Sequence, residues 1–285
     1  FINIIALIFY FIVIGGFSIN DLGYFILTFF TASIVLENFL TSYKTRLEEI
    51  NILKDQENYR REFLGNVSHE LKTPLFTIQG YILTLIEGAL KDKKVRGKYL
   101  RRSAKGVDRL ISIVKDLDLI TQFESGIKTV DKTDFNIYEL IENVYDLMEF
   151  ESEKNNTKLL VYNENNTPVI VNADKERILQ VLTNLVVNSI KYGKEGGYTK
   201  VKVEEYDKDR IIVRVKDNGE GIEDEHLPRL FERFYRIDKN RSRKKGGSGL
   251  GLSIVKHIIE AHQEQIFVES KIGQGTEFSF TLQKP

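Results

Sequence analysis

Residues 68–75 read SHELKTPL and place a histidine, an acid and a threonine in one helical pattern. Positions i and i+4 of an α-helix share a face, so we expect Thr73 one turn above His69, on a surface that a partner could reach. Pro74 can bend or loosen the helix at this point. An exposed, deprotonated imidazole is a nucleophile near neutral pH. Most isolated His-Glu pairs are ordinary surface residues, so the meaning of His69 and Glu70 depends on the rest of the chain.

Two long helices are predicted around this stretch. Residues 43 to about 91 have apolar side chains at helical spacing, and a polar turn at residues 91–94 precedes a second helix over residues 95 to about 123. Two helices alone bury little surface, so we expect a dimer whose four helices form a bundle. The alternative is a helical hairpin that packs on its own second domain. The second helix has apolar positions in steps of three, four and seven, typical of a bundle seam: Leu100, Val107, Leu110, Val114, Leu117 and Thr121.

The N-terminal 40 residues have the composition of membrane-spanning segments. They contain only Asp21 and Glu37 as charged residues. Residues 1–18 form an uncharged run, roughly the minimum length for a span, and residues 22–36 form a second apolar run that can extend to residue 40. A polar break at residues 18–21 predicts a transmembrane helical hairpin, and Lys44 and Arg46 place the downstream chain in the cytoplasm. A signal peptide is the alternative for the first run, although neither a basic n-region nor a small-residue cleavage site is visible.

Overall composition limits the other function classes. The 285 residues allow about two domains plus an extra segment, and 42% hydrophobic residues are enough for real cores. The formal net charge is zero, so bulk charge does not indicate direct nucleic-acid binding. The chain has no cysteine, which fits a reducing cytoplasm.

The C-terminal half mixes helices with short strands. Helices are predicted over residues 135–153, 174–192 and 250–261, with Asp174 as the N-cap of the second. Strands are predicted over residues 158–162, 169–171, 201–206, 210–216, 266–270 and 276–282, and the third and fourth strands form a hairpin. This mixture of helices and antiparallel strands predicts an α+β sandwich.

The helix at residues 174–192 presents two amides and an ammonium together. Stepping 100° per residue places Asn184, Asn188 and Lys191 on one face and the apolar side chains on the other. Amide oxygens suit Mg²⁺, which also keeps waters and phosphate oxygens, and lysine suits phosphate as a point charge. A solvated polar face is the alternative for a helix considered by itself.

Two glycine-containing loops have the chemistry of nucleotide binding. Residues 217–222 read DNGEGI after a strand, where an aspartate can accept a hydrogen bond from an amino group such as that of adenine. An EF-hand spacing is absent, so calcium is discounted. Residues 246–252 read GGSGLGL before a helix, which is an anion cradle but neither a Walker A loop nor a good dinucleotide fingerprint. The predicted ligand-contacting residues of the two loops are Asp217, Gly219, Gly221, Ile222, Gly247, Gly249, Leu250 and Gly251.

A basic stretch at residues 236–245 precedes the second loop and is expected to form a lid over phosphates. A disordered surface loop is the alternative. Phe231 and Phe234 are apolar residues in this polar region and could anchor the lid to its neighbours.

Together, these segments resemble a bacterial sensor histidine kinase of a two-component system over residues 55–285. The order and spacing of the motifs carry this resemblance, since each motif alone is weak. Within the family it is closest to phosphate-regulon (PhoR-like) kinases around residues 62–88, which would imply a response to phosphate limitation. The matching motifs are His69 of the phosphoacceptor box, Asn184 and Asn188 of the asparagine box, Asp217, Gly219 and Gly221 of the first glycine box, Phe231 and Phe234 of the phenylalanine box, Gly247, Gly249 and Gly251 of the second glycine box, and the final element at Gly273–Thr276.

The resemblance implies catalytic roles around the histidine. His69 would attack the γ-phosphate of ATP, and Glu70 would orient or deprotonate its imidazole. Thr73 is similar to the residue that positions water when such kinases dephosphorylate their partner. The reaction would be in-line phosphoryl transfer, in which positioning and Mg²⁺ supply most of the catalysis. The other histidines, His226 and His257 among them, are expected to be structural or surface residues.

The resemblance also implies the nucleotide contacts. Asn188 would hold Mg²⁺ with Asn184 close to the phosphates, and Lys191 would contact phosphate. Tyr192 would lie near the base. Asp217 would bind the adenine amino group, assisted by Thr276.

The implied organisation has four parts. Residues 1–40 would be two transmembrane helices, residues 41–54 a helical connector, residues 55–125 the dimerisation and histidine phosphotransfer domain, and residues 132–285 the catalytic ATP-binding domain of the fold shared with Hsp90 and gyrase. The chain would be a homodimer in the bacterial inner membrane, with its catalytic domains in the cytoplasm. Its partner would be a response regulator.

Two other classes remain open, namely an ATPase of this fold that acts as a conformational clamp and a non-catalytic membrane scaffold. The sequence also departs from the family pattern. Ser189 stands where alanine usually follows the second asparagine, and Gln263 and Glu264 stand where two glycines are common, so that turn is expected to differ. No HAMP domain is recognisable between the membrane segment and the bundle.

Overall fold

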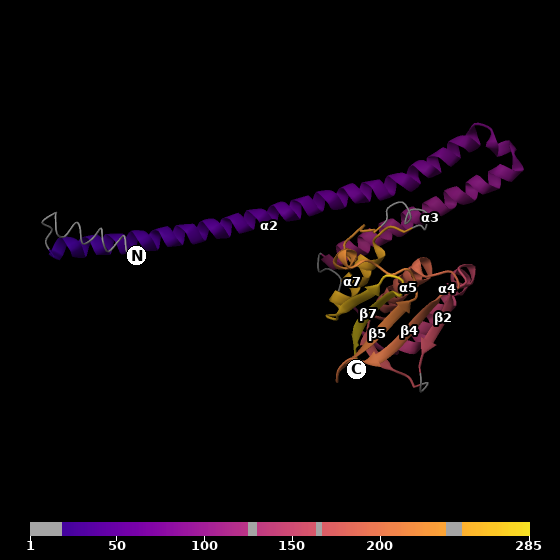
Figure 1. Ribbon diagram of the computed structural model, residues 1–285. Coiled ribbons are helices and arrows are strands. Elements are labelled where there is room, and N and C mark those ends of the chain that lie inside the picture. Colours follow the sequence, from indigo (N-terminus) through magenta and orange to yellow (C-terminus); the bar gives the residue numbers. More distant parts are fainter. Residues whose placement is uncertain (1–18, 125–129, 164–166, 238–246) are drawn as a thin grey trace. The chain divides into compact units, whose positions relative to one another are not determined.

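The computed structural model describes residues 19–124, 130–163, 167–237 and 247–285 (Figure 1). They form two compact units, residues 1–65 and residues 66–285. The helices are α2 (Ile19–Ile86), η1 (Ala89–Lys91), α3 (Lys93–Glu124), α4 (Ile137–Lys154), α5 (Lys175–Tyr192), η2 (Asp224–Arg229) and α7 (Gly251–Ala261). The strands are β1 (Thr133–Asn136), β2 (Lys158–Tyr162), β3 (Ile170–Ala173), β4 (Tyr198–Glu205), β5 (Arg210–Asp217), β6 (Ile266–Lys271) and β7 (Gly275–Gln283).

The N-terminal part of α2 is apolar. Among the described residues, α2 is the one helix that is long and apolar enough to cross a membrane, by length and composition alone. The predicted hairpin of two spans is not confirmed, because its first helix falls on residues 1–18, outside the described residues. Asn20 and Asp21, predicted as part of a polar break, lie within α2.

The predicted helical hairpin around His69 is present as α2 and α3. The first helix ends at Ile86 instead of residue 91, because Gly88 takes a φ of 135° that interrupts it. Asp92 then accepts a hydrogen bond from the backbone N–H of Lys94 at 2.8 Å and so caps the start of α3. The two helices approach closely at Gly106, where an added Cβ would lie 2.6 Å from Cγ1 of Ile78.

The C-terminal part is the predicted α+β sandwich, with one correction in its topology. Five strands form a sheet in the order β2-β4-β5-β7-β6, and β1 pairs with β3 in a separate two-stranded sheet. The predicted hairpin is confirmed, with Val201 opposite Val215 in β4 and β5. The expectation of antiparallel strands is wrong for β2, which pairs parallel to β4. Strand β1 was not predicted, and its last two residues fall in the helix predicted over residues 135–153, which begins at Ile137 instead.

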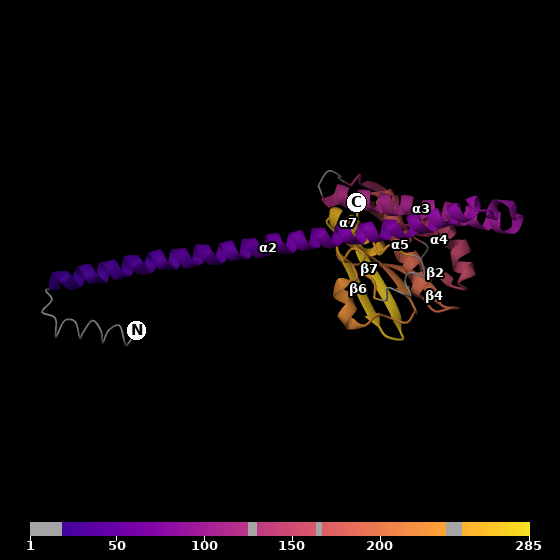
Figure 2. The same ribbon diagram turned by 90° about the horizontal axis from the view of Figure 1, so that it is seen from above.

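Helices α4, α5 and α7 cover one face of the five-stranded sheet (Figures 1 and 2). The apolar side of α5 supplies Ile178, Leu182 and Leu185 to the core between the layers, as its 3.6-residue period predicts. The predicted N-cap of this helix is confirmed, since Asp174 Oδ1 accepts a hydrogen bond from the backbone N–H of Arg177 at 3.1 Å.

Helix α7 ends in a Schellman cap formed without glycine. The N–H of Glu264 donates to the carbonyl of Ile259 at 3.1 Å, and the N–H of Gln263 donates to the carbonyl of Glu260 at 2.9 Å. Gln263 takes a φ of 64°, in the left-handed region that glycine occupies without cost. The turn expected to differ from the family pattern therefore closes with a glutamine in the conformation that glycine favours.

We predict that Gln263→Gly stabilises this turn, because it removes the left-handed strain from an exposed position. The expected gain is about 1 kcal/mol in the free energy of unfolding. Urea unfolding of residues 44–285, followed by circular dichroism, measures it. Gln283→Gly, at the exposed end of β7, is the matched control and should bring no gain. Equal effects of the two substitutions would contradict the strain at Gln263.

A buried histidine, His262, links the end of α7 to the start of α5. Its Nδ1–H donates to the carbonyl of Ile258 at 2.8 Å, and its Nε2 accepts from the backbone N–H of Asp174 at 3.0 Å. Burial lowers the pKa of His262 below the usual value of 6.5. The folded chain therefore holds this imidazole neutral, since a proton on Nε2 would face the N–H of Asp174.

We predict that His262 contributes stability to the domain that is lost as the pH falls below about 6.5. The unfolded chain takes up a proton at His262 in that range and the folded chain does not, so the contribution is fully present above the unfolded pKa. Unfolding free energies between pH 5 and 8 measure the slope, and His262→Gln should flatten it. Burial also lowers the pKa of His257, so this histidine contributes to the pH dependence of stability as well. The variant His257→Gln measures its contribution separately from that of His262. A slope unchanged in His262→Gln would show that this imidazole does not titrate with folding.

Candidate functional site

A cavity of about 570 Å³ lies between α5, α7, the end of β5 and part of α3. Its volume is in the range of small-molecule sites. Eleven of the predicted ligand-contacting residues line it: Asn184, Asn188, Lys191, Tyr192, Asp217, Gly221, Ile222, Gly247, Gly249, Gly251 and Thr276. Four of the predicted residues are not in its lining: Gly219, Phe231, Phe234 and Leu250.

One face of α5 points into the cavity. Asn184, Asn188 and Lys191 line it together, as their spacing predicts. On the opposite side, Ser189 is buried, and its hydroxyl lies 2.6 Å from that of Thr199 on β4. The helix therefore contributes two amides and an ammonium to the cavity while its other side stays in the core.

Asp217 closes the inner end of the cavity. Its buried Oδ1 accepts hydrogen bonds from the backbone N–H groups of Gly219 at 2.8 Å and Thr276 at 3.2 Å. Burial raises its pKa, although these two amides act in the opposite direction. Gly219 thus acts through Asp217 and not as a lining residue. Gly221 must be glycine, because its φ is 77° and a Cβ would collide with the carbonyl oxygen of Lys271.

The glycine-rich loop leads into α7, which begins at Gly251, one residue after its predicted start. Gly249 has a φ of 76°, and its absent Cβ leaves room for the backbone of Phe234, whose N–H donates to the Gly249 carbonyl at 2.9 Å. Leu250 is fully buried in the core. Phe231 packs edge-on against Phe278, which does line the cavity. Leu250, Phe231 and Phe234 support the glycine-rich loop without lining the cavity themselves. The predicted lid falls largely on residues 238–246, outside the described residues.

Sequence reasoning missed the wall that α3 supplies. Arg109, Ser112, Ile113 and Asp116 line the cavity, and burial raises the pKa of Asp116 to about 6. A charged residue at helical spacing looks like part of a solvated face, so no local pattern identified them. Arg236, at the start of the predicted lid, also lines the cavity.

The residues around His69 lie as their helical spacing predicts. His69 and Thr73 are exposed, and the Thr73 hydroxyl donates to the carbonyl of His69 at 3.2 Å. The side chain of Glu70 is only 14% exposed and pairs with Arg109 at 3.2 Å and with Arg236 at 3.4 Å. Both arginines also donate to the carbonyl of Gly247 in the glycine-rich loop. Glu70 is thereby connected to the wall of the cavity.

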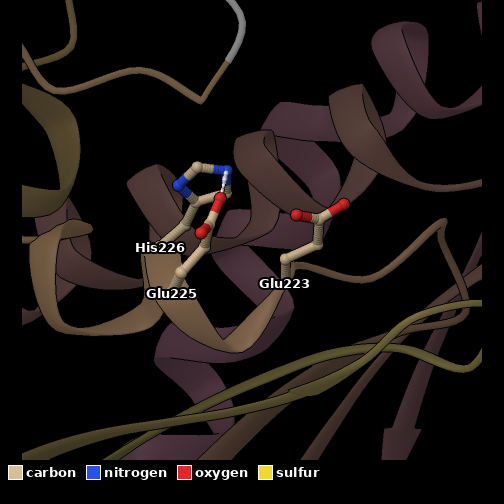
Figure 3. A group of neighbouring side chains, drawn as sticks. All are labelled: Glu223, Glu225 and His226. Carbon is tan, nitrogen blue, oxygen red and sulfur yellow. Dashed lines mark ion pairs between the residues drawn. The ribbon is translucent and has the colours of Figure 1, made fainter.

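A second group of titratable side chains lies on η2. Figure 3 shows Glu223, Glu225 and His226, whose ligand atoms lie within 4.8 Å of one another. His226 Nε2 is 3.6 Å from Glu225, and its Nδ1 is 2.8 Å from the hydroxyl of Tyr235, which lines the cavity. Both glutamates are exposed, as on many surfaces without a metal. The contact with Tyr235 agrees with the structural role expected for His226.

Comparison with protein families identifies both parts of residues 66–285. Residues 59–126 match the His Kinase A (phospho-acceptor) domain. Residues 173–285 match the histidine kinase-, DNA gyrase B- and HSP90-like ATPase family. The chain belongs to the bacterial two-component sensor histidine kinases.

Individual relatives agree with this assignment. The sensor histidine kinase WalK of Bacillus subtilis (strain 168) is 37% identical over 229 residues, which are 80% of this chain and 37% of WalK. A WalK of Staphylococcus aureus is 35% identical over 247 residues, 86% of this chain and 58% of that protein. The chain thus spans between about a third and three fifths of the length of these relatives. The assignment to a phosphate-regulon subgroup stays a prediction.

A solved structure supports the same fold. Histidine kinase ThkA, in complex with the response regulator protein TrrA, superposes with a TM-score of 0.62 at 28% identity. The match covers 81% of this sensor kinase and 64% of ThkA. The ATPase family implies that the domain containing this cavity binds ATP. Its buried carboxylate and its amide and ammonium face suit the two ends of such a nucleotide.

We predict that Asp217→Asn weakens nucleotide binding more than tenfold. Asparagine keeps the volume, but if its oxygen still accepts from the amides of Gly219 and Thr276, its NH₂ group meets the amino group of the base, donor against donor. An unsatisfied buried donor costs about 1–3 kcal/mol. Calorimetric titration with ATP measures the loss. Asp209→Asn, in the exposed β4–β5 turn, is the control for loss of one charge. An unchanged affinity in Asp217→Asn would contradict the role.

Proposed function

We propose that the chain autophosphorylates His69 from Mg-ATP and passes the phosphoryl group to an aspartate of a response regulator. The observation that carries the proposal is the exposed His69 next to Glu70, whose carboxylate contacts the wall of the nucleotide cavity through two arginines. Glu70 thus connects the neighbourhood of His69 to the cavity that we propose to bind phosphate.

The cavity suits magnesium as well as nucleotide. Asn184 and Asn188 offer neutral amide oxygens on one helical face, and Asp116 adds a carboxyl group from α3. Hard oxygen ligands of this kind suit Mg²⁺. We assign Asn188 as the metal ligand, with Asn184 near the phosphates. Bound Mg²⁺ would neutralise the charge that develops on the phosphate oxygens.

The remaining contacts divide between the two ends of the nucleotide. Lys191 would bind phosphate. Its Nζ lies close to Gly247, because a Cβ added to Gly247 would be 2.9 Å from that Nζ. Asp217, with Thr276, would accept from the amino group of adenine, and Tyr192 would lie near the base. Gly221, Gly249 and Gly251 would let the backbone approach the ligand closely.

At the phosphoacceptor, an imidazole nitrogen of His69 would attack the γ-phosphorus as the bond to ADP breaks. The proton on the other ring nitrogen would pass to Glu70, acting as general base. This carboxylate must first part from Arg109 or Arg236, with which it is paired. Release of Glu70 would then accompany the arrival of phosphate, a stronger partner for arginine. Thr73 would position the water that hydrolyses the phosphorylated regulator.

The assembly would be a homodimer anchored in the bacterial cytoplasmic membrane. Leu100, Val107 and Val114 of the predicted seam are between 44% and 55% exposed in the single chain, so this face of α3 has apolar surface available to a second subunit. The apolar N-terminal part of α2 would span the membrane, with a second span at residues 1–18. Residues 41–54 would connect it to the phosphotransfer domain.

We predict that wild-type protein incubated with Mg-[γ-³²P]ATP acquires an acid-labile, base-stable phosphate, and that His69→Gln acquires none. Asn188→Asp should bind ATP but lose labelling, because it alters the metal ligand. His257→Gln, which changes another histidine, is the matched control and should keep labelling. Undiminished labelling of His69→Gln would refute the proposal. Hydrolysis of ATP without any phosphoprotein would favour the conformational clamp.

A further inference from the structure

The first half of α3 carries an unpaired row of positive charge. Residues 91–105 hold eight lysines and arginines and one acid. All eight are exposed, and none forms an ion pair within the described part of the chain. Four of them share one helical face at steps of four, three and four, and we call them the basic α3 stripe: Lys94, Lys98, Arg101 and Lys105.

This placement works against the stability of α3. Like charges at i,i+4 repel by about 0.2–0.5 kcal/mol per pair, and cations at a helix N-terminus oppose its dipole. Asp92, which caps this end, is the one acid there, and the first turn of α3 contains none. A row of cations that the isolated helix does not favour indicates an anionic partner for this face.

Helix α4 carries the complementary row. Four exposed acids share one face at the same steps of four, three and four, and we call them the acidic α4 stripe: Glu142, Asp146, Glu149 and Glu153. None of these carboxylates forms an ion pair in the residues that the structure describes. Lys154, the one cation of α4, pairs with Glu151 instead.

The two stripes match in length and in shape. Each covers twelve residues, with about 16 Å of helix between its first and last Cα atoms. Because the spacing reads the same in both directions, the rows can align parallel or antiparallel. Leu147 and Phe150 stand beside the acids and are 63% and 73% exposed. Gly97 and Ala104 stand beside the cations and leave room for them.

We propose that the basic α3 stripe of one copy of this chain docks on the acidic α4 stripe of a second copy. Within the described part of one chain no ion pair joins the two rows, so the matching charge is supplied by another copy. The matched spacing favours this partner over a nucleic acid or a lipid surface, which would need only the cations. The contact would hold the ATP-binding domain of one copy, through α4, against α3 of the other copy. It does not depend on phosphorylation of His69.

The absence of native cysteine allows a direct test with the full chain in detergent micelles. Ala104→Cys and Asn143→Cys put one thiol beside each stripe without altering a charge. The two variants are co-produced with different affinity tags, isolated through both tags, and treated with a short bis-maleimide. We expect a cross-linked dimer at 50 mM salt and its loss at 0.5 M salt, because exposed ion pairs are screened. Glu269→Cys, on the exposed edge strand β6, replaces Asn143→Cys in the control and should give no such product.

Charge reversal decides between the stripes and other contacts. Three charge reversals are added to the Ala104→Cys chain: Lys94→Glu, Lys98→Glu and Arg101→Glu. They should lower the yield of cross-linked dimer at least about tenfold, because complementary charge is lost and reversed. Glu142→Lys, Asp146→Lys and Glu149→Lys, added to the Asn143→Cys chain, should restore it. The first set also places acids near a helix N-terminus, which favours folding, and circular dichroism checks this.

Three outcomes would overturn the proposal. The first is an unchanged yield with the reversed α3 stripe. The second is a loss that the reversed α4 stripe does not restore. The third concerns a chain that carries both thiols and is mixed with an excess of cysteine-free chain. If its yield of cross-linked product equals the yield without the excess, the contact lies within one copy. Binding to phosphatidylglycerol vesicles or to duplex DNA that depends on the α3 stripe, without cross-linking, would assign the stripe to that other partner.

Discussion

The hydrogen bond between His262 and Asp174 fixes the two helices on which the cavity depends. It joins the C-terminal end of α7 to the N-terminal end of α5, at 3.0 Å between Nε2 and the backbone nitrogen. The opposite ends of the same helices line the cavity, α5 with Asn188 and Lys191 and α7 with Gly251. His262 itself is buried, while the other ends of the two helices present polar groups to the cavity. A neutral imidazole is required at the pinned end, so the stability of the site is linked to pH.

The sequence predicts best those features that repeat at a fixed period or sit at an element boundary. The polar face of α5 and its N-cap at Asp174 follow from local rules, and the structure confirms them. Helix α7 begins one residue after its predicted start. Helix α2 ends early because one backbone angle at Gly88 outweighs the helical pattern that continues beyond it. The parallel pairing of β2 with β4 is a choice of tertiary structure, which alternation along one strand does not encode.

The part of the cavity wall from α3 could not be predicted, and the reason is physical. Arg109 and Asp116 belong to a helix whose pattern is explained by bundle packing alone. Arg109 also donates to the carbonyl of Gly247, 138 positions along the chain, and both residues line the cavity. Charge pairing across that distance leaves no trace in spacing. Glu70 illustrates the consequence, because its sequence context suggests a free general base while the folded chain gives it two guanidinium partners.

A net charge of zero describes this chain poorly, because its charges are segregated by element. The first half of α3 is basic and the outer face of α4 is acidic, so each helix alone carries repulsion that the other could relieve. Repulsion of this kind is screened in salt but is not abolished at the short distances within one helical turn. Residues 66–285 thus build an apolar core around α5, while the basic α3 stripe and the acidic α4 stripe form no ion pair in the described part of the chain. The free energy left in those two surfaces can be recovered only by association, and the strength of that association must vary with ionic strength, whereas the packing of the core does not.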